Sequence, residues 1–367
     1  MEDVKSETIL SGIYKPTFLV DTAKASVNIS RMVSRANMAD AVLRPHFKTH
    51  QLHRVGELFK TFGVQRIAVS SVSMAEYFAD GGWSDIMIAF PVNIREIDRI
   101  NALAKRVTLG ILVSAEGVSP QLAAKLQSSV RMYIEVDVGA NRTGFLPDAV
   151  EQIAKAIAQA EKNPWIKFSG FVAHAGHTYQ TPNTQQVSEI HRQGMNSLNR
   201  LKEQFQRQHP EIVVSWGDTP SCTLADDFFG AEELRPGNFV YFDVMQWQLG
   251  ACAMEDIAVA VATPVVAVYP KRNDLVVYGG AVHLSKESVL CNKGRPHFGM
   301  MVLLNENGSW ELPSSPCFVR RITQEHGVIA LPNDFANRFS VGDLVGILPV
   351  HSCLAADLLR NYTVFLH

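Results

Sequence analysis

Short apolar runs alternate along most of the chain with stretches whose apolar positions recur every three or four residues. The latter spacing predicts amphipathic helices, and it is clearest in three segments: Val55–Phe62, Ile153–Ala160 and Leu198–Phe205. A further strand at Phe18–Val20 ends at Asp21, a suitable N-cap for a helix that extends to about Asn37. Helices and strands therefore alternate from the beginning of this region.

The short apolar runs between the helical stretches predict buried β-strands. We place eight of them at Ala41–Phe47, Arg66–Ser70, Ile86–Phe90, Val107–Val113, Met132–Val138, Phe168–His174, Ile212–Trp216 and Leu234–Phe242. Eight alternating strand–helix units predict a (β/α)8 barrel of the TIM type. The alternative is a doubly wound open sheet, which would need a Gly-rich turn after its first strand, and this chain has none there.

The pattern changes after residue 250, where β-rich runs are separated by Pro, Gly and Asn and no amphipathic helix is evident. These runs are Thr263–Tyr269, Asp274–Tyr278, Cys317–Val319, Gly327–Ala330 and Leu344–Leu348. We therefore predict two domains, a barrel at residues 16–250 and an all-β domain at 251–367 that residues 1–15 join.

Composition excludes several classes of protein. Hydrophobic residues make up 47% and charged residues 19% of the 367 residues, and the net charge is −2, so neither nucleic acid nor an anionic membrane is an expected partner. No apolar run is long enough to span a membrane, and residues 1–15 lack the apolar core of a secretory signal. The five cysteines show no Cys-x-x-Cys spacing. We expect a cytoplasmic protein.

A lysine at the end of the first predicted barrel strand is the first candidate for chemistry. Lys48 stands in Arg44-Pro-His-Phe-Lys-Thr-His50, where a side-chain amine could form a Schiff base with a carbonyl compound. The alternative is an ordinary solvated loop lysine. Chemistry in a barrel belongs at the carboxyl ends of the strands, and phosphate is often bound after strands seven and eight.

Four other segments follow the predicted strand ends: Asp137–Phe145, His174–Tyr179, Gly217–Ser221 and Arg235–Asn238. The last two contain Gly and hydroxyl or amide side chains, which suit a phosphate group, although simple turn geometry would also explain the glycines. A Schiff-base lysine facing a phosphate site implies pyridoxal 5′-phosphate (PLP), which acts as an electron sink for a carbanion at the amino-acid α-carbon.

These motifs, in this order, resemble the alanine-racemase-like fold type III PLP enzymes and, more narrowly, the D-serine dehydratase and D-threonine aldolase group. The resemblance covers almost the whole chain and implies a barrel with a C-terminal β domain in a homodimer. It implies that Lys48 holds PLP and removes the α-proton. The other implied cofactor-binding positions are Arg142 at the ring phenolate, Arg235 at the ring nitrogen, His174 at the ring face, Tyr179 near the lysine and phenolate, and Gly217, Thr219, Gly237 and Asn238 at the phosphate.

His351 and Cys353 form a second informative motif. On an extended segment, side chains at i and i+2 point to the same side, so both could bind one metal ion. Imidazole and thiolate suit Zn²⁺, although another divalent metal is an alternative and random placement also produces such pairs. The resemblance implies that a His-x-Cys pair marks the dehydratases, whereas the aldolases tend to carry His-x-Asp.

We therefore predict a PLP- and zinc-dependent lyase that acts on a β-hydroxy D-amino acid, with D-serine dehydration to pyruvate and ammonia favoured. Catalytic roles fall on Lys48, Tyr179, His351 and Cys353. A metal ion on the β-hydroxyl would assist the departure of a poor leaving group. The alternatives are a D-threonine aldolase, a 3-hydroxyaspartate dehydratase, an amino-acid racemase and a non-enzymatic PLP carrier. A contribution from His283 stays open.

Overall fold

The computed structural model describes residues 9–181, 183–291 and 294–366. Its chain divides into two compact units. Ile29–Phe239 form one, which we call the barrel unit. The described residues up to Asn28 and those from Val240 onward form the other, which we call the β unit. Helix α1 (Thr22–Met38) contains the first boundary between them.

The barrel unit is built on one sheet of parallel strands. In chain order they are β2 (Val42–Leu43), β3 (Arg66–Val69), β4 (Asp85–Pro91), β5 (Thr108–Val113), β6 (Val130–Glu135), β7 (Ile166–His174), β8 (Val213–Gly217) and β9 (Glu233–Leu234). Their spatial order is β2-β9-β8-β7-β6-β5-β4-β3. A parallel bridge between His46 and Ala68 joins the end of β2 to β3 and closes the sheet. The predicted barrel is therefore confirmed, and a doubly wound open sheet is excluded.

Each of the eight predicted runs overlaps one barrel strand, but the first and the last strands are much shorter than expected, and β9 shares only Leu234 with the predicted run Leu234–Phe242. Strand β2 stops before Pro45, and β9 stops before Pro236. Proline lacks the backbone N–H that a ladder requires. The chain therefore leaves the sheet early at both positions and enters the loops that carry Lys48 and Arg235.

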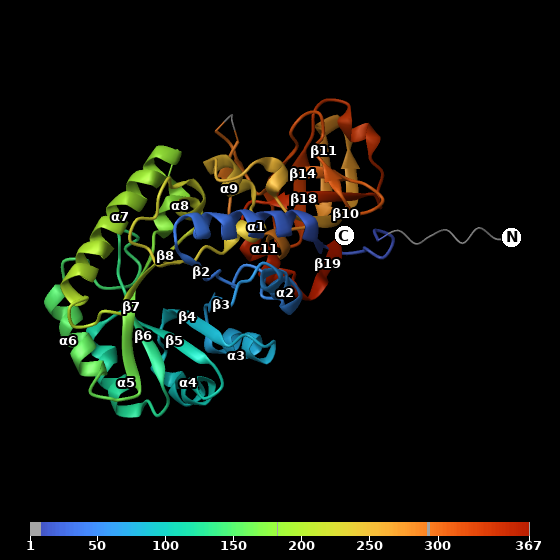
Figure 1. Cartoon of the computed structure of the whole chain (residues 1–367). Helices are drawn as coiled ribbons and strands as arrows, with labels where there is room; N and C mark the ends of the chain where they lie inside the picture. Colours follow the sequence, from blue (N-terminus) through green and yellow to red (C-terminus); the bar gives the residue numbers. More distant parts are fainter. Residues whose placement is uncertain (1–8, 182, 292–293, 367) are drawn as a thin grey trace. The chain divides into compact units, whose positions relative to one another are not determined.

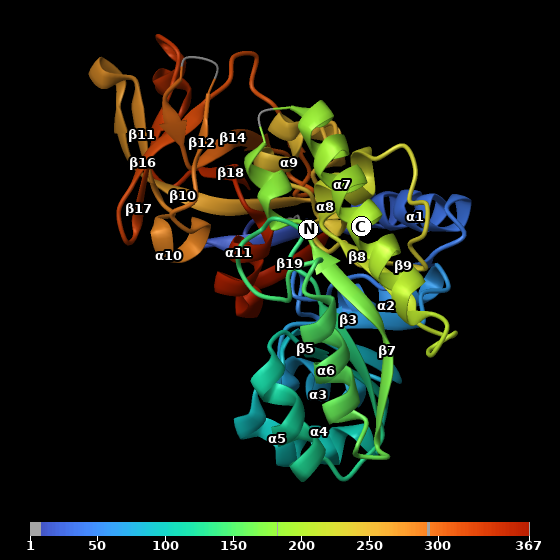
Figure 2. The same ribbon diagram turned by 90° about the vertical axis from the view of Figure 1, so that its left-hand side faces the viewer.

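Helices follow the strands and lie outside the sheet, as Figures 1 and 2 show for α4, α5 and α6. They are α2 (His53–Thr61), α3 (Val72–Asp80), α4 (Ile97–Ala104), α5 (Ser119–Lys125), α6 (Val150–Ala160), α7 (Thr184–Phe205) and α8 (Thr219–Leu224). The three segments of helical spacing lie in α2, α6 and α7, and their apolar positions are largely buried.

An aromatic cluster anchors the chain immediately before Lys48. Phe47 is fully buried, and its ring centroid lies 5.0 Å from that of Phe59, 4.9 Å from that of Phe78 and 5.1 Å from that of Trp83. Aromatic rings at these separations stabilise one another beyond simple burial. The cluster therefore fixes the backbone from which Lys48 projects.

The β unit contains an extensive, mostly antiparallel sheet. Its strands are β1 (Thr17–Asp21), β10 (Val259–Tyr269), β11 (Asp274–Tyr278), β14 (Gly299–Leu304), β15 (Trp310–Glu311), β16 (Phe318–Ile322), β17 (His326–Ala330), β18 (Leu344–Pro349) and β19 (Thr363–Leu366). A separate hairpin consists of β12 (Val289–Leu290) and β13 (Pro296–His297). Strands β11, β17 and β16 lie side by side in Figure 2.

The described part of the β unit also contains three short α-helices: α9 (Val244–Leu249), α10 (Ala281–Leu284) and α11 (Ser352–Leu358). The last two lie after residue 250, where the sequence predicts no amphipathic helix. Each has fewer than three turns, so the apolar period is too short to be recognised in the sequence. Helix α11 matters most, because it contains Cys353.

The predicted domain limits, 16–250 and 251–367, differ from the compact units of the structure. Strand β1 pairs with β10 in antiparallel and with β19 in parallel orientation. Its residues Phe18, Leu19 and Val20 are buried in the β unit, although we assigned them to the barrel. Residues 240–250 also belong to the β unit. Of the predicted joining segment 1–15, residues 1–8 lie outside the described residues.

We expect Phe47→Ala to lower the free energy of unfolding by about 3–5 kcal/mol, because it removes the central ring of the cluster and leaves a cavity. Urea denaturation measures this change. The control is Phe229→Ala at a side chain that is 84% exposed, which should change stability by less than about 0.5 kcal/mol. Equal unfolding midpoints for Phe47→Ala and the wild type would contradict the structural role of the cluster.

Candidate active site

Lys48 lies in the turn that follows β2. Phe47 and Thr49 on either side are buried, whereas Lys48 is exposed. The backbone N–H of Lys48 donates a hydrogen bond to His46 Nδ1 at 3.3 Å. The amine is therefore presented outward by a backbone that is anchored before and after it.

The predicted residues of the barrel unit follow the carboxyl ends of its strands, which lie at one face of a parallel barrel. Lys48 follows β2, Arg142 lies in the loop after β6, His174 ends β7, Gly217 ends β8, and Arg235 follows β9 directly. The structure thus brings together at one barrel mouth residues that are far apart in the sequence.

The barrel mouth is strongly cationic. Burial lowers the pKa of His46 and of His174 well below the usual value, and the charges of Lys48, Arg142 and Arg235 lower it further. Both imidazoles are therefore neutral at physiological pH, while three cationic side chains surround them. Such a potential favours an anionic ligand such as a phosphate or a carboxylate.

Arg142 is held near a buried carboxylate that sequence reasoning missed. Glu135 ends β6, and its Oε1 lies 3.8 Å from Arg142 Nη2. Glu135 also accepts hydrogen bonds from Ser114 Oγ at 2.5 Å and from Thr143 Oγ1 at 3.0 Å. These bonds fix the carboxylate, beside which the exposed Arg142 side chain lies.

Two glycines of the predicted phosphate segments allow close packing at the mouth. A Cβ at Gly237 would lie 2.8 Å from the backbone oxygen of His46 and 2.9 Å from Thr49 Oγ1. A Cβ at Gly217 would lie 3.1 Å from the side chain of Arg235. Side chains at either position would displace the Lys48 turn or the arginine. Asn238, which follows Gly237, is buried.

The start of α8 presents a buried hydroxyl that suits a phosphate. Thr219 is fully buried, and its Oγ1 has no hydrogen-bond partner in the described protein. Asp218 caps the helix, since its Oδ1 accepts from Ser221 N at 2.7 Å and from Thr178 Oγ1 at 3.0 Å. An unsatisfied buried hydroxyl is costly unless a ligand completes its bonding.

Tyr179 lies in the short helix η3 (Gly176–Gln180). Its hydroxyl accepts a hydrogen bond from the backbone N–H of Thr219 at 3.3 Å. This contact places the Tyr179 hydroxyl beside the start of α8. Its position near Lys48 and the cofactor phenolate stays a prediction.

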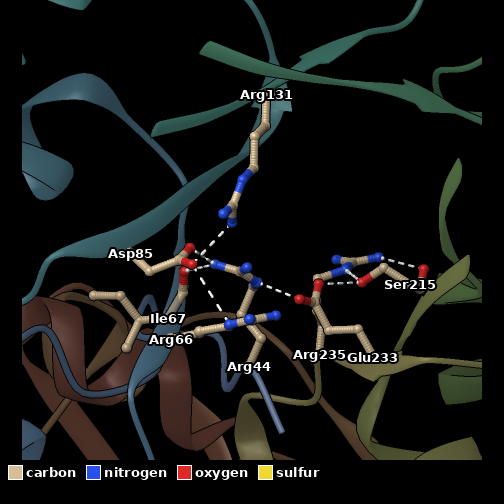
Figure 3. A network of polar contacts seen from close by, with 8 residues as sticks. All are labelled: Arg44, Arg66, Ile67, Asp85, Arg131, Ser215, Glu233 and Arg235. Carbon is tan, nitrogen blue, oxygen red and sulfur yellow. Dashed lines mark hydrogen bonds and ion pairs between the residues drawn. The ribbon is translucent and has the colours of Figure 1, made fainter. Parts of the chain in front are cut away.

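Arg235 is buried and held by three hydrogen bonds. Its Nε donates to Ser215 Oγ at 2.8 Å, and its Nη2 donates to the carbonyl oxygens of Ala173 at 2.6 Å and Ser215 at 3.2 Å. Figure 3 shows this arginine at one end of a polar network that continues through Glu233 to Arg44. The guanidinium orientation is therefore set by the barrel wall.

These observations fit a phosphate-bearing aldehyde cofactor. The mouth combines one exposed amine, two arginines and the unsatisfied Thr219 hydroxyl, and it contains neutral rather than charged histidines. An amine can bind an aldehyde covalently, and the cations and the hydroxyl can bind its anionic groups.

The predicted metal pair belongs to the β unit. We expected an extended segment at His351–Cys353, and for the backbone that expectation is wrong. His351 is the extended N-cap residue of α11, and Cys353 lies in its first turn. Asp243 explains the helix start, because its Oδ2 accepts from Ser352 N at 2.9 Å and from Ser352 Oγ at 3.2 Å.

The His351 and Cys353 side chains nevertheless contact each other. Burial lowers the pKa of His351, but its hydrogen bonds to Cys353 and to Glu287 together raise it to about 11. Glu287 Oε2 lies 2.7 Å from His351 Nδ1. This imidazole thus lies between a thiol and a carboxylate, an arrangement that also favours a bound cation. Sequence reasoning missed Glu287.

The described residues contain no group of three or more His, Cys, Asp or Glu side chains arranged to hold a metal ion. A metal at His351 and Cys353 would therefore need ligands from outside that set, such as water or a substrate hydroxyl. His283, also in the β unit, accepts from the backbone N–H of Gly280 at 3.3 Å and lies 3.9 Å from Glu325.

The sequence matches two known domain families. Residues 20–244 match the family "Alanine racemase, N-terminal domain", and residues 258–365 match the "Putative serine dehydratase domain". Together the two matches cover most of both units.

Similar proteins match along nearly the whole chain. A D-serine dehydratase from Dictyostelium discoideum is 26% identical, over 97% of this chain and 94% of its own length. A D-threo-3-hydroxyaspartate dehydratase from Delftia sp. is 28% identical, over 95% of this chain and 93% of its own length.

Solved structures support the fold assignment. The structure of D-threo-3-hydroxyaspartate dehydratase from Delftia sp. HT23 superimposes with a TM-score of 0.89 at 24% identity and covers 98% of this chain and 96% of that chain. D-threonine aldolase from Filomicrobium marinum gives a TM-score of 0.78 at 20% identity, with coverages of 94% and 89%. The chain therefore has the alanine-racemase-like fold.

Among the described residues, no helix has both the length and the hydrophobicity that crossing a bilayer requires. The five cysteines, all of them described, form no disulfide.

Asp218 gives a testable pH dependence, because burial raises its pKa to about 6 from 3.8. The folded protein thus binds more protons than the unfolded chain between these values, and the stability contributed by Asp218 is lost as the pH rises through about 6. Between about pH 5 and about pH 7.5, we expect the free energy of unfolding of the wild type to fall by about 1.4 kcal/mol more than that of Asp218→Asn.

Urea denaturation of both cofactor-free proteins at the two pH values measures this difference. The asparagine keeps an oxygen that can accept from Ser221 N and Thr178 Oγ1, so the comparison isolates the charge. A constant difference in stability between the two pH values would contradict the assigned burial.

Proposed function

This chain belongs to the family of the alanine racemase N-terminal domain, and from that premise we propose that it is a PLP- and metal-dependent lyase of β-hydroxy D-amino acids. The favoured reaction is dehydration of D-serine to pyruvate and ammonia. The observation that carries the proposal is the convergence of Lys48, Arg142 and Arg235 at one barrel mouth.

The barrel unit would hold the cofactor. Lys48 would bind its aldehyde carbon covalently, and Arg142 and Arg235 would lie at the ring phenolate and the ring nitrogen. His174 would lie at the ring face. The phosphate would be bound near Gly217, Thr219, Gly237 and Asn238, with Tyr179 beside the same helix start.

The bound cofactor supplies an electron sink that stabilises negative charge at the substrate α-carbon. Lys48 Nζ would accept the proton from that carbon as the general base. The neutral state of His46 and His174 supports this role, because uncharged imidazoles do not add positive charge beside an amine that must lose its proton.

His351 and Cys353 would bind the metal ion, and Zn²⁺ is the favoured identity because imidazole and thiolate are its usual ligands. The metal supplies a Lewis acid that helps the β-hydroxyl to leave. Glu287 would orient His351 through Nδ1 and leave Nε2 for the metal. One similar solved structure is described as a D-threo-3-hydroxyaspartate dehydratase mutant in the metal-free form.

The similarity to a D-threo-3-hydroxyaspartate dehydratase favours 3-hydroxyaspartate as a second candidate substrate. The Delftia relative, named a D-threo-3-hydroxyaspartate dehydratase, has a slightly higher identity to this chain than the Dictyostelium D-serine dehydratase. Dehydration of 3-hydroxyaspartate is therefore the first alternative, and D-threonine aldol cleavage on the same scaffold is the next. An amino-acid racemase would need a second base, which the described site does not identify.

The assembly and the cellular location stay predictions. We propose a homodimer on the basis of the resemblance to fold type III enzymes. We also propose a cytoplasmic location, which the absence of disulfides among the five cysteines supports.

We expect Lys48→Ala to lower turnover by at least ~1000-fold, because it removes both the covalent attachment and the base. Borohydride treatment of the PLP-loaded wild type, followed by peptide mapping, should place the label on Lys48 alone. Lys105→Ala removes an exposed lysine after α4 and should keep full activity. A label on another lysine would refute the proposed function.

We expect a chelator to lower dehydration by at least about tenfold and Zn²⁺ to restore it. Elemental analysis should find the metal in the wild type and in Cys291→Ala, which changes another cysteine of the β unit, but not in Cys353→Ala. A panel of D-amino acids, with separate detection of 2-oxo acid, ammonia, glycine and aldehyde, distinguishes dehydration from aldol cleavage. If glycine and an aldehyde are the products, the proposed dehydratase activity is wrong and the aldolase activity takes its place.

A further inference from the structure

We propose that Glu233 is a positioning residue that acts through the Ser215 hydroxyl to orient Arg235 and to screen its charge at the barrel mouth. The inference rests on the proposed function, in which Arg235 faces the cofactor ring nitrogen. The sequence alone assigns no role to Glu233. It is the second of two consecutive glutamates that precede Leu234.

The register of two parallel strands places Glu233 beside Ser215. Strand β9 pairs with β8 so that Glu233 lies opposite Ser215 and Leu234 lies opposite Trp216. Both Glu233 and Ser215 are buried in the barrel unit, with 3% and 0% of their surfaces exposed. Ser215 Oγ donates to Glu233 Oε1 at 2.6 Å. This contact therefore follows from strand pairing and not from a flexible loop.

The Ser215 hydroxyl can be the donor in only one of its two hydrogen bonds, the one to Glu233. Arginine has donors but no acceptor, and an ionised carboxylate has acceptors but no donor. Because Arg235 Nε donates to Ser215 Oγ at 2.8 Å, the single hydroxyl proton must go to Glu233. The Ser215 hydroxyl thus accepts from Arg235 and donates to Glu233. The orientation of Arg235 therefore depends on the Glu233 carboxylate.

Glu233 is itself immobilised from the other side, as Figure 3 shows. Its Oε2 accepts from Arg44 Nε at 2.6 Å. Arg44 Nη1 in turn donates to Asp85 Oδ1 at 2.8 Å, and Asp85 Oδ2 lies 2.9 Å from Arg131 Nη1. The Glu233 carboxylate therefore lies between two arginines: it bonds Arg44 directly, and it bonds Arg235, at the mouth, through the Ser215 hydroxyl.

The two arginines of this network differ in their carboxylate partners. Arg44 has two carboxylate partners, Glu233 and Asp85. Arg235 has no ion pair of its own within the described structure, and Glu233 is the carboxylate that most strongly favours its charged form. Loss of Glu233 would therefore leave a buried cation less compensated and raise the positive potential that Arg235 exerts at the mouth.

The test uses the PLP-loaded full chain and follows the pH titration of the visible absorbance of the bound cofactor. We expect Glu233→Gln to move the midpoint of that titration to lower pH by about one unit, because a nearby negative charge is lost. Ser215→Ala removes the link without changing a charge, and it should weaken PLP binding about tenfold in equilibrium dialysis.

The matched control is Glu232→Gln, since Glu232 pairs with Lys202 and its Oε2 accepts from the backbone N–H of Val214. This variant removes a charge one residue away and should leave the titration and the affinity for PLP unchanged. The double variant Ser215→Ala/Glu233→Gln should weaken PLP binding no more than the stronger single variant, because both changes break one pathway.

Each outcome decides one question. A wild type that neither binds PLP nor carries the borohydride label on Lys48 refutes the proposed function itself. A wild type that binds PLP, with Glu233→Gln titrating as Glu232→Gln does, overturns the positioning role and leaves the function intact. If Glu233→Gln does not fold, Ser215→Ala decides alone, and unchanged affinity for PLP overturns the inference.

Discussion

The ion pair between Arg44 and Glu233 inside the barrel is the interaction on which the rest of the site depends. Removing two charges from water is expensive, and their attraction compensates only when the remaining donors and acceptors are also satisfied. Here Arg44 bonds to Glu233, Asp85 and the carbonyl oxygen of Ile67. A pair bonded this completely tolerates little displacement, so it holds β2 and β9 at a defined separation.

That fixed separation determines the positions of the chemically active side chains. Lys48 follows β2 and Arg235 follows β9, each within a few residues of the ion pair. The strands are short because proline ends their ladders, and the aromatic cluster around Phe47 anchors the turn between β2 and the lysine. Rigid support of this kind keeps the three cationic side chains of the mouth in defined positions.

Much of the fold follows from the sequence, because strand and helix periods depend on local patterns of apolar residues. All eight predicted barrel runs overlap strands, the last at Leu234 alone, and the candidate residues at the strand ends lie at one mouth. The assignment of β1 could not be made in this way. Its apolar residues fit either sheet, and only the pairing with β10 and β19 shows where they belong.

The supporting carboxylates were also beyond the reach of the sequence. Glu135, Glu233 and Glu287 look like ordinary surface residues until strand register and helix position are known. The contrast between Glu232 and Glu233 shows why: a shift of one residue along a strand reverses the face of the side chain. One of them pairs with Lys202, and the other lies in the barrel interior with Arg44.

The pairing of β1 with β19 has a consequence for biosynthesis. The barrel unit is one continuous segment, whereas the β unit combines residues from before and after it. A ribosome completes the barrel segment first, and domains generally fold as units during synthesis. The first sheet neighbour of β1 is β10, which begins at Val259. More than two hundred codons are therefore translated between Thr17 and the first residue of that neighbour. Until β10 is made, the apolar residues of β1 have no sheet neighbour, so a nascent chain of this protein carries an unpaired apolar strand through the synthesis of the whole barrel segment.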